Sequence, residues 1–214
     1  MFCFQCQEAA KGTGCTIKGM CGKEGSTADL QDLLIHNLKG IGILAKKAKA
    51  AGINVPESTG VFVGKALFTT ITNMNFDDEN LNRWILDAQA IKKDLYESVK
   101  DKSGDLHDAA TWFSSDVSGF AAKAATVGVL ATENEDVRAL RELLIYGLKG
   151  IAAYADHAAV LGVTKEEIWD FLYEALASTT QDLSVDEMVA IVLKAGEITV
   201  TTMAALDEAN TGAY

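Results

Sequence analysis

The fold is decided by LQDLLIHNLKGIGILAKKAKAAGI, residues 30–53. Its apolar side chains recur every three or four residues, which places them on one face of an α-helix. The pattern returns 110 residues later as LRELLIYGLKGIAAYADHAAVLGV, residues 140–163, and eleven of the 24 aligned positions are identical. We interpret this agreement as an internal repeat of a helical unit.

The similarity continues more weakly in the residues that follow each stretch, and it predicts three helices in each half. We expect helices over residues 27–52, 60–73 and 77–101, and again over 136–162, 165–180 and 184–209. A single proline and abundant alanine and leucine also favour helices. The predicted fold class is all-α: two three-helix bundles at 27–101 and 136–214, joined by a packed linker at 102–135.

Helix ends are marked by polar residues and glycine. Ser26 or Thr27 is suited to cap the first helix, and Gly52 to end it. The acidic residues that follow Asn75 and Ser184 are interpreted as capping and helix-dipole partners rather than as metal ligands.

Two lysine–glycine pairs recur in the repeat, Lys39-Gly40 and Lys149-Gly150. We expect such a glycine to let another element approach the helix closely, and such a lysine to be solvated. Histidines cannot form a di-iron carboxylate site here, because that chemistry needs Glu-x-x-His on two helices and the sequence has none. The three histidines, His36, His107 and His157, are therefore expected to be surface or capping residues.

The candidate metal ligands are concentrated at the start of the chain. All four cysteines, Cys3, Cys6, Cys15 and Cys21, fall in the first 21 residues, with the spacing C-x2-C-x8-C-x5-C. Glycines are interleaved among them, so we expect residues 1–26 to form a cluster-binding loop rather than a helix. Structural disulfides would be spread over the whole domain that they cross-link, and no secretion signal precedes the cysteines. Both points disfavour disulfides.

Four thiolates suit a [4Fe–4S] cluster, a [2Fe–2S] cluster or a tetrahedral zinc ion. The five residues between Cys15 and Cys21 are many for a zinc knuckle, which favours iron–sulfur chemistry. Lys11, Lys18 and Lys23 make the segment mildly positive, which favours thiolates, although lysines in a loop are also ordinarily solvated.

The charge of the whole chain restricts its partners. The net charge is −11, and no sustained basic face is visible, so neither a nucleic acid nor an anionic membrane is expected as partner. We also expect no apolar stretch of the roughly 18 residues that a membrane-spanning helix needs. These features predict a cytoplasmic protein that meets a small molecule or a redox protein.

The opening MFCFQCQEAAKGTGCTIKGMCGK, residues 1–23, closely resembles the N-terminus of the hybrid-cluster protein family, also called the prismane or hydroxylamine reductase family. The stretches at residues 66–78, 127–162 and 174–214 resemble the helical domain of the same family. The resemblance therefore covers essentially the whole chain.

This resemblance implies that Cys3, Cys6, Cys15 and Cys21 hold a cubane [4Fe–4S] cluster, since a longer spacing accompanies [2Fe–2S] in a related subgroup. It also implies a helical domain of two three-helix bundles in a cytoplasmic protein. Full-length members would reduce hydroxylamine, and nitric oxide, at a hybrid cluster bound by His, Glu and Cys in later domains.

Those later ligands are missing, because no cysteine follows Cys21. We therefore expect a truncated electron-transfer domain that lacks the hybrid cluster and is not catalytic alone. Its partners would be a redox protein and the missing C-terminal domains, and the surface freed by truncation would also allow homo-oligomers. Two rival interpretations remain: a helical interaction module in which the metal is a structural staple, and a sensor of nitrosative or oxidative stress.

Overall fold

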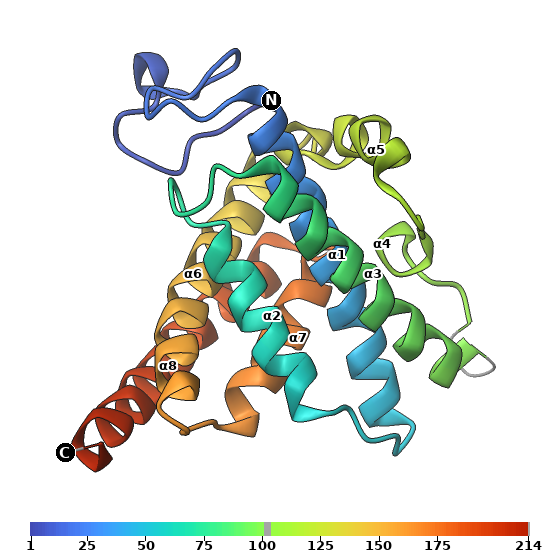
Figure 1. The fold of residues 1–214 in the computed structure, drawn as a ribbon, viewed down its shortest axis with the longest axis vertical. Helices are drawn as coiled ribbons and strands as arrows, with labels where there is room; N and C mark the ends of the chain where they lie inside the picture. The colour runs from blue at the N-terminus through green and yellow to red at the C-terminus, as the bar shows by residue number, and fades with distance from the viewer. Residues whose placement is uncertain (101–103, 214) are drawn as a thin grey trace.

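The computed structural model describes residues 1–100 and 104–213, and in that part of the chain all long elements are helices (Figure 1). The six main helices are α1 (Gly25–Ala50), α2 (Glu57–Thr69), α3 (Asp78–Val99), α6 (Glu135–Val160), α7 (Glu166–Ser178) and α8 (Val185–Gly212). Shorter turns of helix are η1 (Ala10–Gly12), α4 (Asp108–Thr111), η3 (Val117–Gly119), α5 (Phe120–Val127) and η4 (Val129–Ala131). The predicted all-α class is confirmed.

All six predicted helices exist, with ends that differ from the expected ones by a few residues. The expected end of the third helix at residue 101, and the expected start of the linker at 102, lie outside the described residues. Gly52 ends α1 as predicted: its φ is +72°, and the Ile53 N–H donates to the Ala48 carbonyl at 2.8 Å.

The N-terminal caps follow the sequence in α3 and α8 and not in α1. Asp77 accepts a hydrogen bond from the Asn80 N–H, and Ser184 forms a capping box with Glu187. The expectation for Ser26 or Thr27 is wrong, because α1 starts at Gly25 and has no side-chain cap. The Thr27 hydroxyl instead donates to Asp78 Oδ1 at 2.6 Å, which ties the start of α1 to the start of α3.

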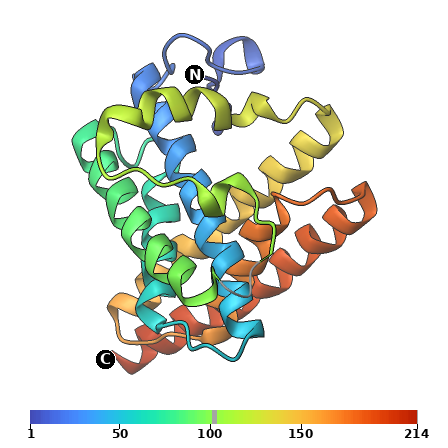
Figure 2. The same ribbon diagram turned by 90° about the vertical axis from the view of Figure 1, so that its right-hand side faces the viewer.

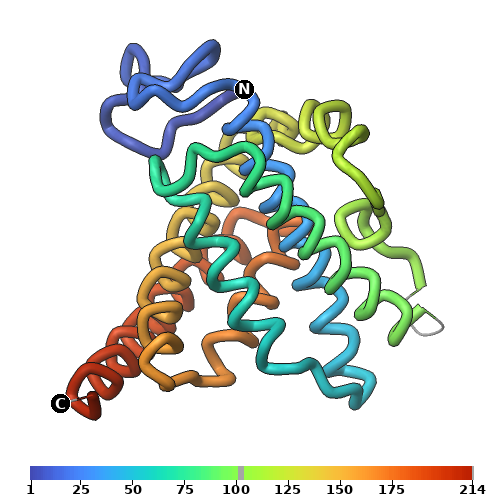
Figure 3. Tube along the Cα trace, in the orientation of Figure 1, coloured from blue at the N-terminus to red at the C-terminus, as the bar shows by residue number. Residues whose placement is uncertain are grey.

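The two halves of the chain are interleaved. The long first helix of each half packs along the third helix of the same half, α1 on α3 and α6 on α8. The middle helices cross over: α2 packs mainly against α6 and α7, and α7 mainly against α1 and α2 (Figure 3). Matching pairs of helices thus make matching contacts in both halves, while the internal duplication itself stays a prediction.

α1 lies at the centre and is covered on most sides. Besides α3 and α7 it contacts α4 and α5, which cross it on the face shown in Figure 2. Its close neighbours require glycine. A Cβ on Gly40 would lie 2.1 Å from the Ala109 carbonyl oxygen, and one on Gly42 would lie 2.8 Å from that of Tyr173. The expected close approach at Gly40 is confirmed, whereas a Cβ on Gly150 would meet nothing within 4 Å.

α8 contradicts the expectation that no apolar stretch is long enough to span a membrane. Within the described residues it is long and apolar enough to cross a membrane, judged by length and composition alone. One side of it packs on α6, and the other exposes Leu193, Val200 and Met203. A single helix of this kind is a weak indication of a membrane span, so the absence of a membrane partner stays a prediction.

The glycine contact on α1 can be tested by two matched substitutions. Gly40→Ala should lower the free energy of unfolding by about 2–3 kcal/mol, because the Ala109 backbone must move to admit the methyl group. Gly150→Ala, at the position that the repeat aligns with Gly40, should instead raise it by up to about 1 kcal/mol. Urea unfolding followed by circular dichroism measures both, and equal effects would contradict the packing described.

Candidate metal centre

The cysteine-bearing segment covers one end of the helical body, above the start of α1 (Figure 1). Cys3 and Cys15 face each other in an antiparallel bridge, with N–H to carbonyl distances of 3.0 and 2.8 Å. This bridge is the one β-type pairing among the described residues. It places two of the four predicted ligands side by side although eleven residues separate them in sequence.

The other two cysteines lie in turns of the same segment. Cys6 opens a turn in which its carbonyl accepts the Ala9 N–H at 3.2 Å. Cys21 is exposed, in a turn closed by the Gly22 N–H on the Gly19 carbonyl at 2.9 Å. All four thiols are free, and within the described residues no three His, Cys, Asp or Glu side chains are gathered closely enough to hold a metal ion. The structure therefore pairs Cys3 with Cys15 but does not assemble a complete ligand set.

Two hydrogen-bond donors point at cysteine sulfurs. The Ala10 N–H donates to Cys15 Sγ at 3.4 Å, and Lys23 Nζ lies 4.0 Å from Cys3 Sγ. Donors of this kind stabilise a thiolate more than a thiol, and they are typical of the surroundings of iron–sulfur ligands. These hydrogen-bond donors thus fit a metal centre that is held by cysteine thiolates.

Glycines allow the segment to turn between its cysteines. Gly12 and Gly22 have φ values of +67° and +93°, which disfavour any residue with a side chain. A Cβ on Gly14 would lie 2.5 Å from the Phe2 ring, so the aromatic ring packs directly on the backbone beside Cys15.

Polar side chains fasten this segment to the helices beneath it. The Met1 ammonium group lies 3.2 Å from Asp29 Oδ1 of α1. Gln5 Oε1 accepts hydrogen bonds from the Thr72 N–H and from Lys149 Nζ, both at 3.1 Å. The segment is therefore attached to both halves of the fold.

Two lysines at this contact are buried, contrary to the expectation that they are solvated. Lys23 is 1% exposed and donates to Gln31 Oε1 at 2.7 Å. Lys149 is 3% exposed, and besides Gln5 it donates to the Thr70 carbonyl at 3.1 Å. These hydrogen-bond acceptors are all neutral. Burial lowers the pKa of Lys149 to about 8.

Sequence reasoning missed the role of both lysines. The repeat of Lys39-Gly40 as Lys149-Gly150 was the available signal for Lys149. Nothing in the pattern separates Lys23 from Lys18, which is exposed and paired with Glu24.

An apolar cavity of about 320 Å³ lies directly under the cysteine segment. Phe2, Cys3, Phe4 and Gln5 form its upper wall, and α1, α6 and Val129 of η4 form the rest. The two aromatic rings contact each other with their centroids 5.5 Å apart. Both rings lie beside Cys3 in this wall.

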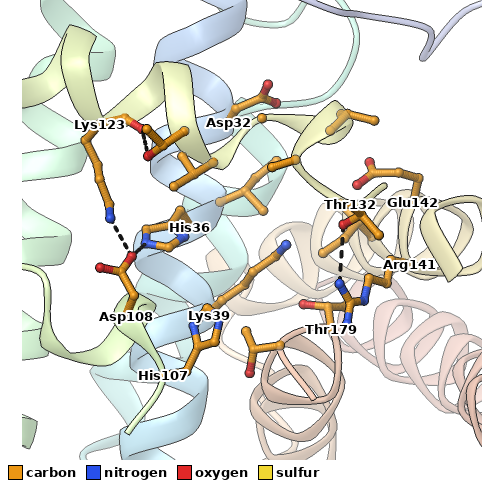
Figure 4. A pocket seen from close by; sticks show the side chains of 18 residues that line it. Asp32, His36, Lys39, His107, Asp108, Lys123, Thr132, Arg141, Glu142 and Thr179 are labelled. Carbon is orange, nitrogen blue, oxygen red and sulfur yellow. Dashed lines mark hydrogen bonds and ion pairs between the residues drawn. The ribbon is translucent and has the colours of Figure 1, made fainter. Parts of the chain in front are cut away.

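A second cavity, of about 270 Å³, lies between α1, α6, the end of α7 and the linker (Figure 4). Its walls are polar, with Asp32, His36 and Lys39 from α1 and Arg141 and Glu142 from α6. Both cavities share a wall formed by Asp32 and Glu142 together with Ile35, Val129 and Ile145.

The histidines have three different settings. His36 is buried beside Asp108, with Nε2 3.0 Å from Oδ2, so the expectation of a surface or capping residue is wrong for it. Burial lowers the pKa of His36 to about 3, so its imidazole is neutral at pH 7. His107 does cap α4, since its Nδ1 accepts the Ala109 N–H at 3.0 Å, and His157 is exposed.

The ionisable groups of the polar cavity are shifted toward their uncharged forms. Burial raises the pKa of Asp32 to about 7, and the neighbouring Glu142 carboxylate adds to the rise. Burial likewise raises the pKa of Glu142 and lowers that of Lys39. Asp108 is the exception, because its ion pair with Lys123 outweighs its partial burial and lowers its pKa.

The chain is similar in sequence to a known family of proteins. A model of the Prismane/CO dehydrogenase family matches residues 1–214. The chain is 58% identical to a hydroxylamine reductase of Nitratidesulfovibrio vulgaris, 54% to one of Halothermothrix orenii and 52% to one of Clostridium novyi. Each match covers 100% of this chain and 40% of the relative, so the chain spans about two fifths of the length of these proteins.

The raised pKa of Asp32 gives a test of the polar cavity. As the pH rises from about 4 to about 7, the unfolded chain ionises this carboxyl while the folded chain resists, so stability is lost over that window. Asp32→Asn removes the group that titrates. The substitution should raise the free energy of unfolding by about 2 kcal/mol more at pH 8 than at pH 5.

Chemical denaturation at the two pH values provides the measurement. Asp87→Asn, at an exposed position of α3, is the control and should show no such pH dependence. An effect of Asp32→Asn that does not change with pH would show that Asp32 is ionised without cost in the folded protein.

Proposed function

Because the chain belongs to the Prismane/CO dehydrogenase family, we propose that its N-terminal segment binds an iron–sulfur cluster and passes single electrons through it. The ligands are Cys3, Cys6, Cys15 and Cys21, and the cluster is [4Fe–4S]. A [2Fe–2S] cluster and a zinc ion are the alternatives that the same four thiolates allow.

The observation that carries this proposal is the pair of buried ammonium groups beneath the cysteines. Lys23 and Lys149 are almost fully buried, and their hydrogen-bond acceptors are an amide oxygen of Gln31 or Gln5 and the Thr70 carbonyl. A buried cation is costly unless an opposite charge lies close to it. Asp32 and Glu142 act on Lys149, whereas no ion pair joins Lys23 to a described carboxylate. Four thiolates around a metal centre leave a net negative charge, which would supply a partner for Lys23 beside Cys3.

The residues of the chain would have distinct tasks around such a centre. The cysteine thiolates hold it, and the Ala10 N–H on Cys15 Sγ and the Lys23 ammonium group near Cys3 Sγ stabilise negative charge on sulfur. Phe2 and Phe4 would place apolar surface beside the centre on the side of the apolar cavity. A bound cluster would supply a reversible one-electron acceptor, and the exposure of Cys21 leaves one side open to a redox partner.

The activity of the longer relatives is proposed for this chain only in part. They carry the name hydroxylamine reductase and are more than twice as long as this chain. We assign to this chain the electron relay, and to the remaining part of the longer protein the catalytic centre, because no cysteine follows Cys21 to hold another cluster. The apolar side chains exposed on α8 are the surface that we assign to contact with that remaining part.

The positive charge of Lys23 should raise the reduction potential of the cluster. Lys23→Met removes a positive charge close to Cys3 and disfavours the more negative, reduced state. At an effective dielectric constant of about 20, this lowers the potential by roughly 100 mV. A redox titration followed by EPR measures the shift. Lys18→Met, which changes an exposed lysine of the same segment, should leave the potential within about 20 mV of the original value because solvent screens it.

The centre itself is tested by iron and acid-labile sulfide analysis of anaerobically purified protein, with EPR before and after reduction. About four irons and four sulfides per chain, and a signal from the reduced cluster that Cys→Ala changes abolish, are the expected results. Zinc without sulfide would refute electron transfer and leave the structural interaction module. A cluster that nitric oxide or oxygen degrades reversibly, and that accepts no electron, would favour the stress sensor.

A further inference from the structure

Glycines inside the long helices mark the places where other elements approach in this fold. Gly40 and Gly42 of α1 receive the backbone of α4 and of α7. Gly60 and Gly64 of α2 face the ring of Trp169, and a Cβ on them would lie 2.4 and 3.1 Å from its atoms. Glycine is less stable than alanine in a helix interior, so we expect each such glycine to serve a contact.

Three further glycines in helix interiors serve no contact within the described residues. A Cβ on Gly147 or Gly150 of α6, or on Gly196 of α8, would meet no atom of the described chain within 4 Å. The two helices lie side by side at one edge of the fold (Figure 1). If these glycines follow the other four, the element that approaches them lies outside this chain.

The outer side of α6 carries no exposed charge. Its residues follow one another at intervals of three or four, which places them on one side of the helix. Between residues 139 and 161 no exposed residue is an aspartate, glutamate, lysine or arginine, although the chain is 23% charged. Depletion of charge is typical of the centre of a protein interface. We call this surface the α6 face; along it lie Ala139, Leu143, Tyr146, Gly150, Tyr154 and His157.

The exposed side of α8 is different. Gly196 lies between Leu193 and Val200, which are exposed, but the exposed side chains of Lys194 and Glu197 stand beside them. The α6 face is therefore the exposed helix surface that combines open glycines with an absence of charge.

The apolar cavity beneath the cysteine segment opens on the α6 face. Ala139, Leu143 and Tyr146 line the cavity and are also exposed to solvent. The polar groups in the wall are occupied within the chain: Lys149 donates to Gln5 and to the Thr70 carbonyl, and Gln31 is bonded as well. What the opening of the cavity offers to a partner is apolar surface.

The α6 face has a pattern that is nearly symmetric about Gly150. Tyr146 and Tyr154 lie four residues to either side of it, and the small residues Gly147 and Ala153 lie three residues to either side. When two such helices cross antiparallel at Gly150, each residue meets the one that is equally far on the other side. The face is therefore complementary to itself, as the interface of a two-fold symmetric dimer must be.

We propose that the α6 face is the interface of a homodimer, in which the α6 helices of two copies of this chain cross antiparallel at Gly150. The half of α6 that carries Tyr154 and Leu161 in one copy then lies over the half that carries Tyr146 and Ala139 in the other. Each copy thus closes the apolar cavity of its partner. A second copy suits this surface because two uncharged faces meet without bringing together the charges of two strongly acidic chains.

The proposal is independent of the metal centre, and sedimentation velocity of the intact chain between about 2 and 200 µM tests it. A single helix pair buries an area at the low end of specific interfaces, so the expected dissociation constant is about 10 µM. More salt should tighten the dimer at least about twofold, because it screens the repulsion between two chains of net charge −11. A chain that stays monomeric at about 200 µM would refute the proposal and leave the α6 face to the rest of the longer protein.

Two matched substitutions locate the interface. Gly150→Ala adds a methyl group where the two helices cross and should weaken the dimer at least about fivefold. Because a Cβ at this position meets no described atom of its own chain, the variant stays folded, which circular dichroism verifies. Gly196→Ala changes an equally open glycine of α8 and should leave the dissociation constant unaltered. Equal effects of the two substitutions, or a larger effect of Gly196→Ala, would contradict the proposed interface.

Discussion

The close approach of backbone to α1 is the constraint on which the rest of the fold depends. α1 receives α4 at Gly40 and α7 at Gly42, at distances that no side chain could occupy. Because these contacts are fixed, the linker crosses α1 closely and Lys92 of α3 can reach beneath it. Its Nζ bonds Asn37 Oδ1 at 2.7 Å and the Ala109 carbonyl at 3.1 Å. The two glycines point to nearly opposite sides of the helix, and so position α4 on one side and α7 on the other.

Charge burial is the second organising feature. Most buried lysines in folded proteins are paired with an acid, yet Lys23 and Lys149 bond neutral oxygens, and Lys39 faces an open cavity. Lys149 lines the apolar cavity and Lys39 the polar one, and Asp32 and Glu142 lie in the wall between the two cavities. A negative metal centre at the cysteines would offset part of the cost of burying Lys23 beside Cys3.

The sequence predicted the fold well because helical signals are local. Apolar spacing, Gly52 and the Ser184 capping box act over a few residues, and the structure has them where the pattern indicates. The path of α2 across to α6 could not be foreseen, because a helix pattern says which face is buried and not which helix covers it.

For the candidate site, the spacing of the cysteines predicted them as metal ligands. It did not predict that a backbone bridge places Cys3 beside Cys15. The burial of Lys23 was missed for a related reason: burial depends on which elements come to surround a side chain, and for a residue in a loop no periodicity reports it. His36 was misjudged in the same way, since the linker that covers it is distant in sequence.

The crossing of the middle helices has a consequence for how such a chain can be divided. α2 completes the surface of α6, and α7 completes that of α1, so a half cut out at the linker would keep its long helix on α3 or α8 but leave a second large packing face of that helix bare. Such a half could recover those contacts only from a second copy, by exchanging middle helices in an intertwined dimer. The smallest foldable unit of this architecture is therefore a pair of halves, whether they are carried on one chain or on two.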